Sequence, residues 1–536
     1  MFPRMRIQFP PIIIYIPHTP SILLSTQNVA MSLPGLPGLG LDEPEEERPV
    51  ETTQHDLAKE HEWRFEVAVG KYVQVKILTG TAELFGTELI AGNTYTFTGT
   101  KAAIYTWQGC SFEVSGDALQ SEYTAEETPM SEYINVHFAL ESLRDQAKAS
   151  GRPGPRVLIV GPEDAGKSSL AKILTGYAQR ASRAPVLANL DIKEGVMSIP
   201  GTITATVFKT LMDVEEGWGA APMSGPNGAI PVKLPLVYFF GSSNSQEKDG
   251  VVYKAQASRL ALAVAGRIAQ DQDARESGLI IDTPGSLTST KTGPIGNEII
   301  QTIVSEFAVS AIICLGSERL YSDMVKRFDG QATSTRTTTN PPETIAVIKL
   351  NKSGGCVDRD EAYMQALRAA QIRSYFYGNP RLSNGISLQP RQQQVDFSTL
   401  TVWRRISSTP DPTSGIGGVG LDDDDDESFL PGGIDDDSSS HNASGSKVAL
   451  PASQIYERMT GPVATMRQSV LAVLNCEPEA DQEVIRDASV MGFLYVTDTD
   501  EARSRISLLS PVAGRVPNRA IVWAGWPESV LGLDRS

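Results

Sequence analysis

The segment 161–169, with the sequence GPEDAGKSS, constrains the fold of this chain more than any other feature. It matches in full the phosphate-binding pattern of a glycine, four residues and Gly-Lys-Ser, in which the glycines let consecutive backbone N–H groups face phosphate oxygens. The run RVLIV at 156–160 predicts a strand before the loop, and apolar residues at helical spacing predict a helix after it. This order of strand, loop and helix indicates an α/β domain that binds a nucleoside triphosphate.

Two side chains of this loop have a clear chemical role. The ammonium group of Lys167 suits the β- and γ-phosphates, and the hydroxyl group of Ser168 suits Mg²⁺. The loop also contains the acidic pair Glu163 and Asp164, although phosphate is itself an anion. We therefore expect both carboxylates to point away from the phosphates, because they would otherwise weaken binding.

A chain of 536 residues is long enough for about three or four domains. Within 151–378, strand patterns alternate with helical patterns, which predicts a doubly wound parallel sheet. The strand patterns lie at 157–160, 186–190, 236–240, 279–282, 311–315 and 344–350. The expected parts of the chain are a disordered N-terminal extension at 1–55, a β-sandwich at 56–118, a linker helix at 119–150, the central P-loop domain at 151–378, and a C-terminal domain at 379–536 with a disordered acidic insert at 408–447.

Charge and hydropathy argue against several classes of protein. The net charge of −17 argues against a broad nucleic-acid surface, although acidic runs at 422–427 and 435–437 carry much of it and leave room for a local basic groove. The four cysteines and five histidines show no metal-ligand spacing, which favours free thiols in a reducing compartment. The apolar run 10–24 is short and rich in proline, so no segment is expected to enter a membrane.

A second carboxylate follows a buried strand pattern. Asp282 ends the run at 278–282, and an aspartate in this place holds Mg²⁺ directly or through water in P-loop enzymes. The sequence DTPG at 282–285 also fits the DxxG pattern of GTPases. However, the candidate guanine motif at 351–354 ends in Gly354 where an aspartate is needed, which makes a GTPase the weaker interpretation.

Three further residues each allow two interpretations from the sequence pattern. Asp191 ends another strand pattern, where it would either accept a proton from a substrate hydroxyl or cap a helix. Arg368 and Arg373 lie on a predicted helix at 361–375, where they would either stabilise transition-state charge or face solvent.

Eight motifs in a fixed order extend from residue 62 toward the C-terminus. They are EWRFE at 62–66, LTGTAELFGTE at 78–88, SIPG at 198–201, DVEEG at 213–217, PLVY at 235–238, ERLY at 318–321, KSGG at 352–355 and YFYG at 375–378. By these motifs the chain resembles the Clp-type polynucleotide 5′-hydroxyl kinases. That family includes the kinase of tRNA splicing and a cleavage-factor subunit of pre-mRNA 3′-end processing.

The resemblance implies a β-sandwich that closes over adenine, a central P-loop domain and a small C-terminal α/β domain. It implies ATP and Mg²⁺ as ligands, with Glu62 and Lys101 at the nucleotide and Ser168 and Asp282 at the metal. It also assigns Asp191 to the acceptor side, and Arg368 and Arg373 to a lid. The residues implied to hold the phosphates are Gly161, Asp164, Ala165, Gly166, Lys167, Ser168 and Ser169.

Three positions differ from the active kinases of this family. Those kinases carry Asp-Val-Gly-Gln where this chain has Asp191, Ile192, Lys193 and Glu194, so a cation and an acid replace a glycine and a neutral amide near the γ-phosphate. Ser286 stands where they carry a tryptophan, and base stacking on an aromatic ring contributes about 1–3 kcal/mol. These differences predict weakened or absent kinase chemistry.

The resemblance to the fungal cleavage-factor branch therefore favours an ATP-binding, non-catalytic scaffold subunit of the nuclear machinery for pre-mRNA cleavage and polyadenylation. Its implied partners are other cleavage-factor subunits, with weak or indirect contact to RNA and none to a membrane. The alternative is an active ATP-dependent RNA 5′-hydroxyl kinase, in which Asp191, Arg368 and Arg373 would be catalytic.

Overall fold

The computed structural model describes residues 52–116, 118–215, 235–289, 293–334, 342–383, 385, 387–406 and 454–533. The disorder expected at 1–51 and at 408–447 lies outside these residues. All four cysteines are free thiols, as expected. None of the described helices combines the length and the apolar character that crossing a membrane requires.

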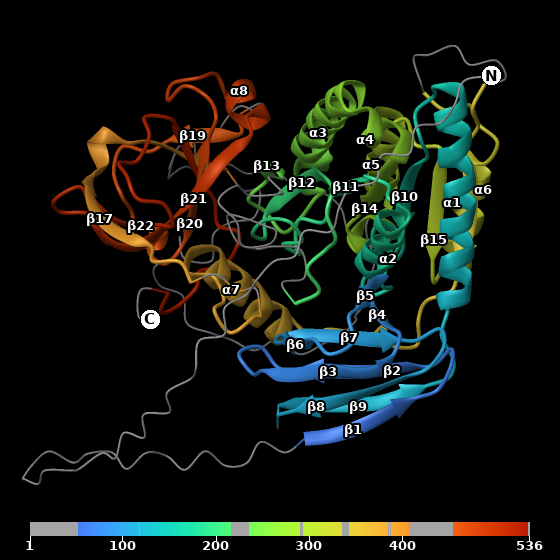
Figure 1. Ribbon diagram of the computed structural model, residues 1–536. Helices are drawn as coiled ribbons and strands as arrows, with labels where there is room; N and C mark the ends of the chain where they lie inside the picture. Colours follow the sequence, from blue (N-terminus) through green and yellow to red (C-terminus); the bar gives the residue numbers. More distant parts are fainter. Residues whose placement is uncertain are drawn as a thin grey trace, which may run out of the picture. The chain divides into compact units, whose positions relative to one another are not determined.

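The N-terminal region is a β-sandwich of two antiparallel sheets, drawn in blue and cyan in Figure 1. Its core contains packed aromatic rings, in which Trp63 stacks on Phe65 and lies tilted against Phe112. One sheet has the order β1 (Thr52–Leu57), β8 (Cys110–Ser115), β3 (Val73–Gly80) and β6 (Thr94–Phe97). The other has the order β5 (Thr87–Leu89), β4 (Ala82–Leu84), β7 (Thr100–Tyr105), β2 (Glu62–Val67) and β9 (Leu119–Ala125).

Two segments differ from the sequence-based prediction of this region. Residues 52–55 belong to strand β1 instead of a disordered extension, and 119–125 form strand β9 instead of part of a linker. Both are edge strands whose side chains are mostly exposed, and backbone pairing with β8 and β2 holds them in place. Such strands carry little apolar alternation, which is the signal that sequence-based prediction uses.

The central sheet has seven strands. Their order is β13 (Leu236–Phe239), β12 (Thr202–Val207), β11 (Val186–Asn189), β14 (Leu279–Asp282), β10 (Arg156–Val160), β15 (Ala311–Leu315) and β16 (Ala346–Leu350). The six strands predicted from the sequence all run in one direction. The seventh, β12, was not predicted and lies antiparallel between β11 and β13, so the sheet is mixed instead of purely parallel. This reversed strand lies toward one edge and leaves the arrangement around the P-loop parallel.

Helices cover both faces of this sheet, as the doubly wound prediction requires. Side chains of β10 alternate between the two faces, and Leu158 and Val160 pack on one face while Val157 and Ile159 pack on the other. The first face is covered by α3 (Val251–Gln270), α4 (Gln272–Ser277), α5 (Gly293–Glu306) and α6 (Glu318–Phe328). The second is covered by α1 (Met130–Ser150) and α2 (Lys167–Arg180).

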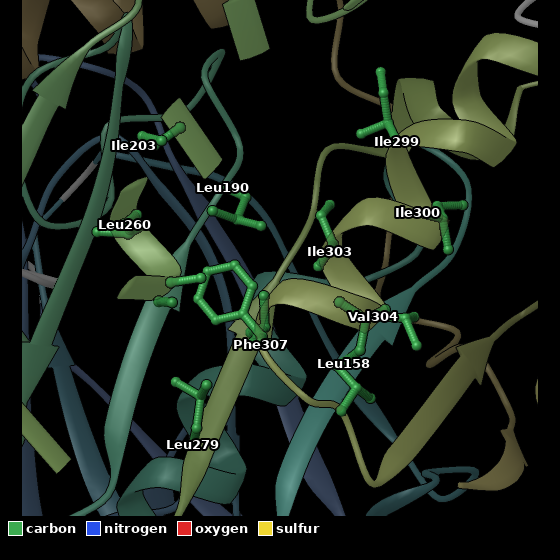
Figure 2. Close-up of a cluster of buried hydrophobic side chains, with 14 of the residues drawn as sticks. Leu158, Leu190, Ile203, Leu260, Leu279, Ile299, Ile300, Ile303, Val304 and Phe307 are labelled. Carbon is green, nitrogen blue, oxygen red and sulfur yellow. The ribbon is translucent and has the colours of Figure 1, made fainter. Parts of the chain in front are cut away.

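Figure 2 shows the first of these cores. In it, Val304 of α5 is drawn beside Leu158, and Phe307, the residue after α5, is drawn next to Leu279. Burying each large aliphatic side chain contributes about 1.5–3 kcal/mol. This packing fixes the strand ends that carry the site residues. Two 3₁₀ turns come after strands of this sheet in the chain, η1 (Glu247–Gly250) after β13 and η2 (Gly285–Thr288) after β14.

The C-terminal region is built on a second seven-stranded mixed sheet. Its order is β17 (Arg391–Asp396), β22 (Arg505–Ser510), β21 (Val490–Asp500), β20 (Val470–Leu474), β23 (Ala520–Trp523), β18 (Thr401–Arg405) and β19 (Tyr456–Arg458). Helices α7 (Glu361–Tyr377) and α8 (Gln482–Asp487) pack on one face through Ile372, Phe376 and Ile485. The turns η4 (Phe397–Thr399) and η5 (Ala464–Met466) contribute Phe397 and Met466 to the other face.

Candidate nucleotide-binding site

The P-loop joins β10 to α2 with a backbone that only glycine permits at two positions. Gly166 has a φ of +88°, and a Cβ atom there would lie 2.6 Å from the Cys356 sulfur atom. A Cβ atom at Gly161 would lie 2.9 Å from the carbonyl oxygen of Leu315. Helix α2 begins at Lys167 without a side-chain cap, so its first N–H groups are available to an anion.

The structure brings Lys167, Ser168 and Asp282 together at the start of α2. The ammonium group of Lys167 is buried and donates to the carbonyl oxygen of Pro162 at 2.8 Å. Ser168 donates its hydroxyl to Oδ2 of Asp282 at 2.6 Å. Burial raises the pKa of the Asp282 carboxyl to about 6, although Lys167 opposes this shift.

The chemistry of this pair fits Mg²⁺. Oδ1 of Asp282 is buried and makes no hydrogen bond within the described part of the chain. A hard divalent cation satisfies such an oxygen, and Mg²⁺ takes one or two protein oxygens together with phosphate and water. Among the described residues, no group of three or more acidic, histidine or cysteine side chains would hold a metal alone. The pair therefore fits a metal that arrives with a nucleotide.

Both acidic side chains of the P-loop are ion-paired. Glu163 lies 3.0 Å from the ammonium group of Lys193. Asp164 accepts hydrogen bonds from Nε of Arg359 at 2.6 Å and from its backbone N–H at 3.1 Å. Arg359 also donates to Glu194 at 2.5 Å. These cations explain how the loop accommodates two carboxylates beside an anion site.

Arg359 was not found by sequence reasoning. It lies just before the predicted helix at 361–375 and is separated from the KSGG motif at 352–355 by residues 356–358. That position next to a motif was the available signal, but nothing in the spacing connects Arg359 to the P-loop.

A cavity of about 450 Å³ opens beside the P-loop, which is in the range of pockets for small ligands. Several of the sequence-predicted site residues line it. They are Lys101, Asp164, Gly166, Lys167, Ser168, Ser169, Asp191 and Arg368.

Glu62 and Lys101 lie at different places in the sandwich. Glu62 pairs with Tyr105 in the β2–β7 ladder, whereas Lys101 pairs with Glu66. The ammonium group of Lys101 lies 3.0 Å from Glu66 and 5.1 Å from the ring centre of Tyr363 on α7. Lys101 thus lies at the wall of the cavity, between the sandwich and α7.

Glu62 is 3% exposed, and both of its carboxylate oxygens have partners. One accepts from Nε of Arg64 at 2.5 Å, and the other accepts from the hydroxyl of Thr128 at 2.8 Å. The Arg64 side chain in turn lies against Gly355, where an added Cβ atom would be 2.9 Å from Nε. In this arrangement Glu62 positions Arg64 against the loop that follows β16.

The acceptor side of the site is formed by the loop after β11 and by η2. Asp191 is buried, and its Oδ1 accepts the backbone N–H of Lys193 at 2.9 Å. Burial and the nearby Glu194 carboxylate raise the pKa of Asp191 to about 7, while Lys167 acts in the opposite direction. Ser286 follows Gly285, and a Cβ atom at Gly285 would lie 2.5 Å from the backbone nitrogen of Glu163.

The two arginines of α7 contact the C-terminal domain. The Arg368 guanidinium is ion-paired with Glu361 and Glu528 and lies 4.7 Å from the ring centre of Trp526. Arg373 donates to the carbonyl oxygen of Gly532 at 3.3 Å and is not among the residues that line the cavity. Arg368 therefore reaches the cavity, and the structure does not bring Arg373 to it.

A complete phosphate loop after the first strand of an α/β domain, with an aspartate beside its serine, defines a P-loop nucleotide-binding protein. Comparison with protein families assigns this protein more closely. Residues 56–147 match the N-terminal beta-sandwich domain of polyadenylation factor, 161–378 match the mRNA cleavage and polyadenylation factor CLP1 P-loop, and 388–528 match the pre-mRNA cleavage complex II protein Clp1. The chain belongs to the Clp1 family, which confirms the family expected from the sequence motifs.

Named relatives agree with this assignment. A protein of Neosartorya fischeri named mRNA cleavage and polyadenylation factor clp1 is 48% identical, over 93% of this chain and 99% of its own length. A protein of Aspergillus niger with the same name is 50% identical, over 91% of this chain and 98% of its own length.

Two solved structures share the fold. One is described as the wild-type Clp1p–Pcf11p complex and is 25% identical with a TM-score of 0.71, covering 89% of this chain and 98% of that one. The other is described as an extended interface between Pcf11p and Clp1p and as the structural basis for ATP loss in a point mutant, with a TM-score of 0.70 at the same identity and coverage.

Proposed function

We propose that this chain is an ATP-binding, non-catalytic scaffold subunit of the nuclear machinery that cleaves and polyadenylates pre-mRNA. The observation that carries this proposal is a contrast within one cavity. The phosphate side has donors and a carboxylate oxygen available for a ligand, whereas Lys193 and Glu194 on the acceptor side are ion-paired with Glu163 and Arg359.

The phosphate side would hold ATP through groups that the fold has already placed. The free N–H groups at the start of α2 and the Lys167 ammonium would bind the phosphate oxygens. Ser168 and Asp282 would hold Mg²⁺, which neutralises phosphate charge when bound. A ligand that binds only the folded state stabilises it in proportion to the logarithm of its concentration over Kd, so retained ATP would act as a structural ligand.

The family also supports a partner. One solved relative is described as a complex with Pcf11p, and the named relatives are cleavage and polyadenylation factors. We infer that this chain binds a Pcf11-type subunit and works in the nucleus, where pre-mRNA is processed.

One observation favours the alternative of an active RNA 5′-hydroxyl kinase. Burial raises the pKa of Asp191 to about 7, and a general base is most effective when its pKa is near the working pH. In that case Asp191 would take the proton of a 5′-hydroxyl group while ATP supplies the phosphoryl group.

Two measurements on the purified full chain separate these functions. The first is mass analysis of co-purified nucleotide and metal, for which we expect ATP and Mg²⁺ in near-equal amounts to protein. The second is transfer of labelled γ-phosphate to a 5′-hydroxyl oligoribonucleotide, with Lys167→Ala as the control. A chain that emerges without nucleotide would contradict the scaffold proposal, and Lys167-dependent transfer at ordinary kinase rates would establish the kinase.

A further inference from the structure

Two sets of ion pairs connect the P-loop with the loop after β11 that carries Lys193 and Glu194, which we call the acceptor loop. The two sets differ in their exposure to solvent. The pair of Glu163 and Lys193 is open to solvent, with side chains 59% and 41% exposed. In the second set, Arg359 bridges Asp164 and Glu194, and these three side chains are 24%, 15% and 21% exposed. Charge pairs that are partly withdrawn from water are screened less by salt and contribute more than open pairs.

Arg359 makes its bridge with both its side chain and its backbone. Nε and the backbone N–H donate to the two different oxygens of Asp164, at 2.6 Å and 3.1 Å. Asp164 itself has a φ of +53°, a conformation that a non-glycine residue adopts at a cost. The two-point contact with Arg359 therefore holds the P-loop in a conformation that Asp164 would not prefer alone.

The loop that carries Arg359 is anchored at its other end. The hydroxyl group of Tyr133 and the carboxylate of Glu132, both on α1, bond to Asn351 at 2.9 Å and 2.6 Å. In the middle of this loop, Arg64 lies against Gly355. These contacts hold the loop at Asn351 and at Gly355. Arg359, further along the same loop, therefore connects an anchored segment to the P-loop and to the acceptor loop.

We propose that Arg359 is a positioning residue that joins the P-loop to the acceptor loop through Asp164 and Glu194, and that this bridge slows release of the bound nucleotide. The inference rests on the proposed function in one respect, because it requires that the site holds a nucleotide. The inference also gives Glu194 a role. A glutamine at that position would keep a hydrogen bond to Arg359 but would lose the ion pair that completes the bridge. Without the bridge the two loops could move apart, which would open the path by which the nucleotide leaves.

The test measures the release rate of a ribose-labelled fluorescent ATP analogue from the full chain after exchange for the endogenous nucleotide. We expect Glu194→Gln and Arg359→Gln each to release the analogue about tenfold faster, which corresponds to about 1.4 kcal/mol. The double variant should release it no faster than Arg359→Gln, because both changes break one bridge. Arg359→Lys should recover part of the slow release, and the wild-type rate should rise with salt more steeply than that of Glu194→Gln.

The matched control is Arg183→Gln. Arg183 also bridges two acids, Glu141 at 2.8 Å and Asp145 at 2.5 Å, with its side chain 16% exposed. It lies outside the cavity lining, so its loss should lower stability without changing the release rate.

The outcomes separate this inference from the proposed function. A wild-type chain that binds no analogue overturns both. A wild-type chain that retains the analogue, with variants that release it at the wild-type rate, or with single effects that add in the double variant, overturns the bridge alone. If Arg359→Gln does not fold, Glu194→Gln and its salt dependence decide the question.

Discussion

The two halves of the cavity use their polar groups in opposite ways. In the phosphate half, the first turn of α2 lacks a cap and Oδ1 of Asp282 has no partner among the described residues. In the acceptor half, Lys193 and Glu194 bond to groups of the protein, and Oδ1 of Asp191 accepts the Lys193 backbone N–H. Since buried polar groups require partners, a half with open groups is prepared for a ligand and a half that is satisfied internally is not. The comparison teaches that the same strand ends can bind a nucleotide without being arranged to transfer its phosphate.

Lys167→Ala should produce the largest effect on this comparison. The variant removes the buried cation of the phosphate half and keeps every side chain of the acceptor half. A hydrogen bond to a charged group contributes up to about 3 kcal/mol, so we expect about a 100-fold loss of ATP affinity. Titration calorimetry on nucleotide-free protein measures this loss. An affinity within threefold of wild type would mean that the phosphate half does not bind the triphosphate.

Gly285→Ala should come next, because Gly285 is the point where the two halves touch. An added Cβ atom would lie 2.5 Å from the backbone nitrogen of Glu163, so the P-loop backbone would have to move. Overpacking of this kind costs about 2 kcal/mol, which predicts about a 30-fold loss of ATP affinity. The matched control is Gly266→Ala on α3, where an added Cβ atom meets nothing within 4 Å. That control should raise the thermal midpoint slightly, since alanine favours a helix.

Asp282→Asn tests whether the metal belongs to the phosphate half. The variant keeps the volume and one hydrogen-bond acceptor for Ser168 but removes the charge that suits Mg²⁺. We expect about a tenfold loss of ATP affinity in Mg²⁺, corresponding to about 1.4 kcal/mol, and no further loss when EDTA is added. Wild-type affinity should fall in EDTA to the level of the variant. A variant that still responds to Mg²⁺ as wild type does would place the metal elsewhere.

Most of the central fold could be predicted because its signals are local. The P-loop lies between a strand and a helix in consecutive residues. Five of the six predicted strands are short apolar runs that become largely buried, and the edge strand β16 is buried only at Leu350. Strand β12, with the sequence TITATV, has the alternation and the β-branched residues of a strand and was overlooked. Its antiparallel place between β11 and β13 depends on pairing that no local pattern shows. The edge strands β1 and β9 were missed for the reason that they bury few side chains.

The candidate site could be predicted only in part, because its contacts join distant segments. The roles of Lys167 and Ser168 follow from one motif, and the pair of Ser168 and Asp282 follows from two neighbouring parallel strands. The bridge from Asp164 to Arg359 spans 195 residues of sequence, and no spacing rule connects its ends. Arg373 is the opposite case. The family resemblance implies that it belongs to a lid, but in this structure its side chain contacts the C-terminal domain.

The smallest expected effect concerns the acceptor half and its response to pH. Burial, and then the Glu194 carboxylate, raises the pKa of Asp191 to about 7, whereas an aspartate in an unfolded chain titrates near about 4. The folded protein thus binds this proton more tightly than the unfolded chain does. The contribution of Asp191 to the free energy of unfolding is therefore present at low pH and is lost as the pH rises toward about 7. Asp191→Asn has no such proton, so the variant should gain stability relative to wild type across this window.

We expect this relative gain to reach at least about 1 kcal/mol between about pH 5 and pH 8, or about 1 °C in the thermal midpoint of a chain of this length. Thermal unfolding of nucleotide-free wild type and Asp191→Asn in matched buffers measures it. A constant difference between the two proteins across the window would mean that Asp191 is already ionised in the folded state at low pH. The acceptor half would then hold a carboxylate whose charge is fully compensated. Such a carboxylate could not serve as a proton acceptor poised near neutral pH, and the kinase alternative would lose its supporting observation.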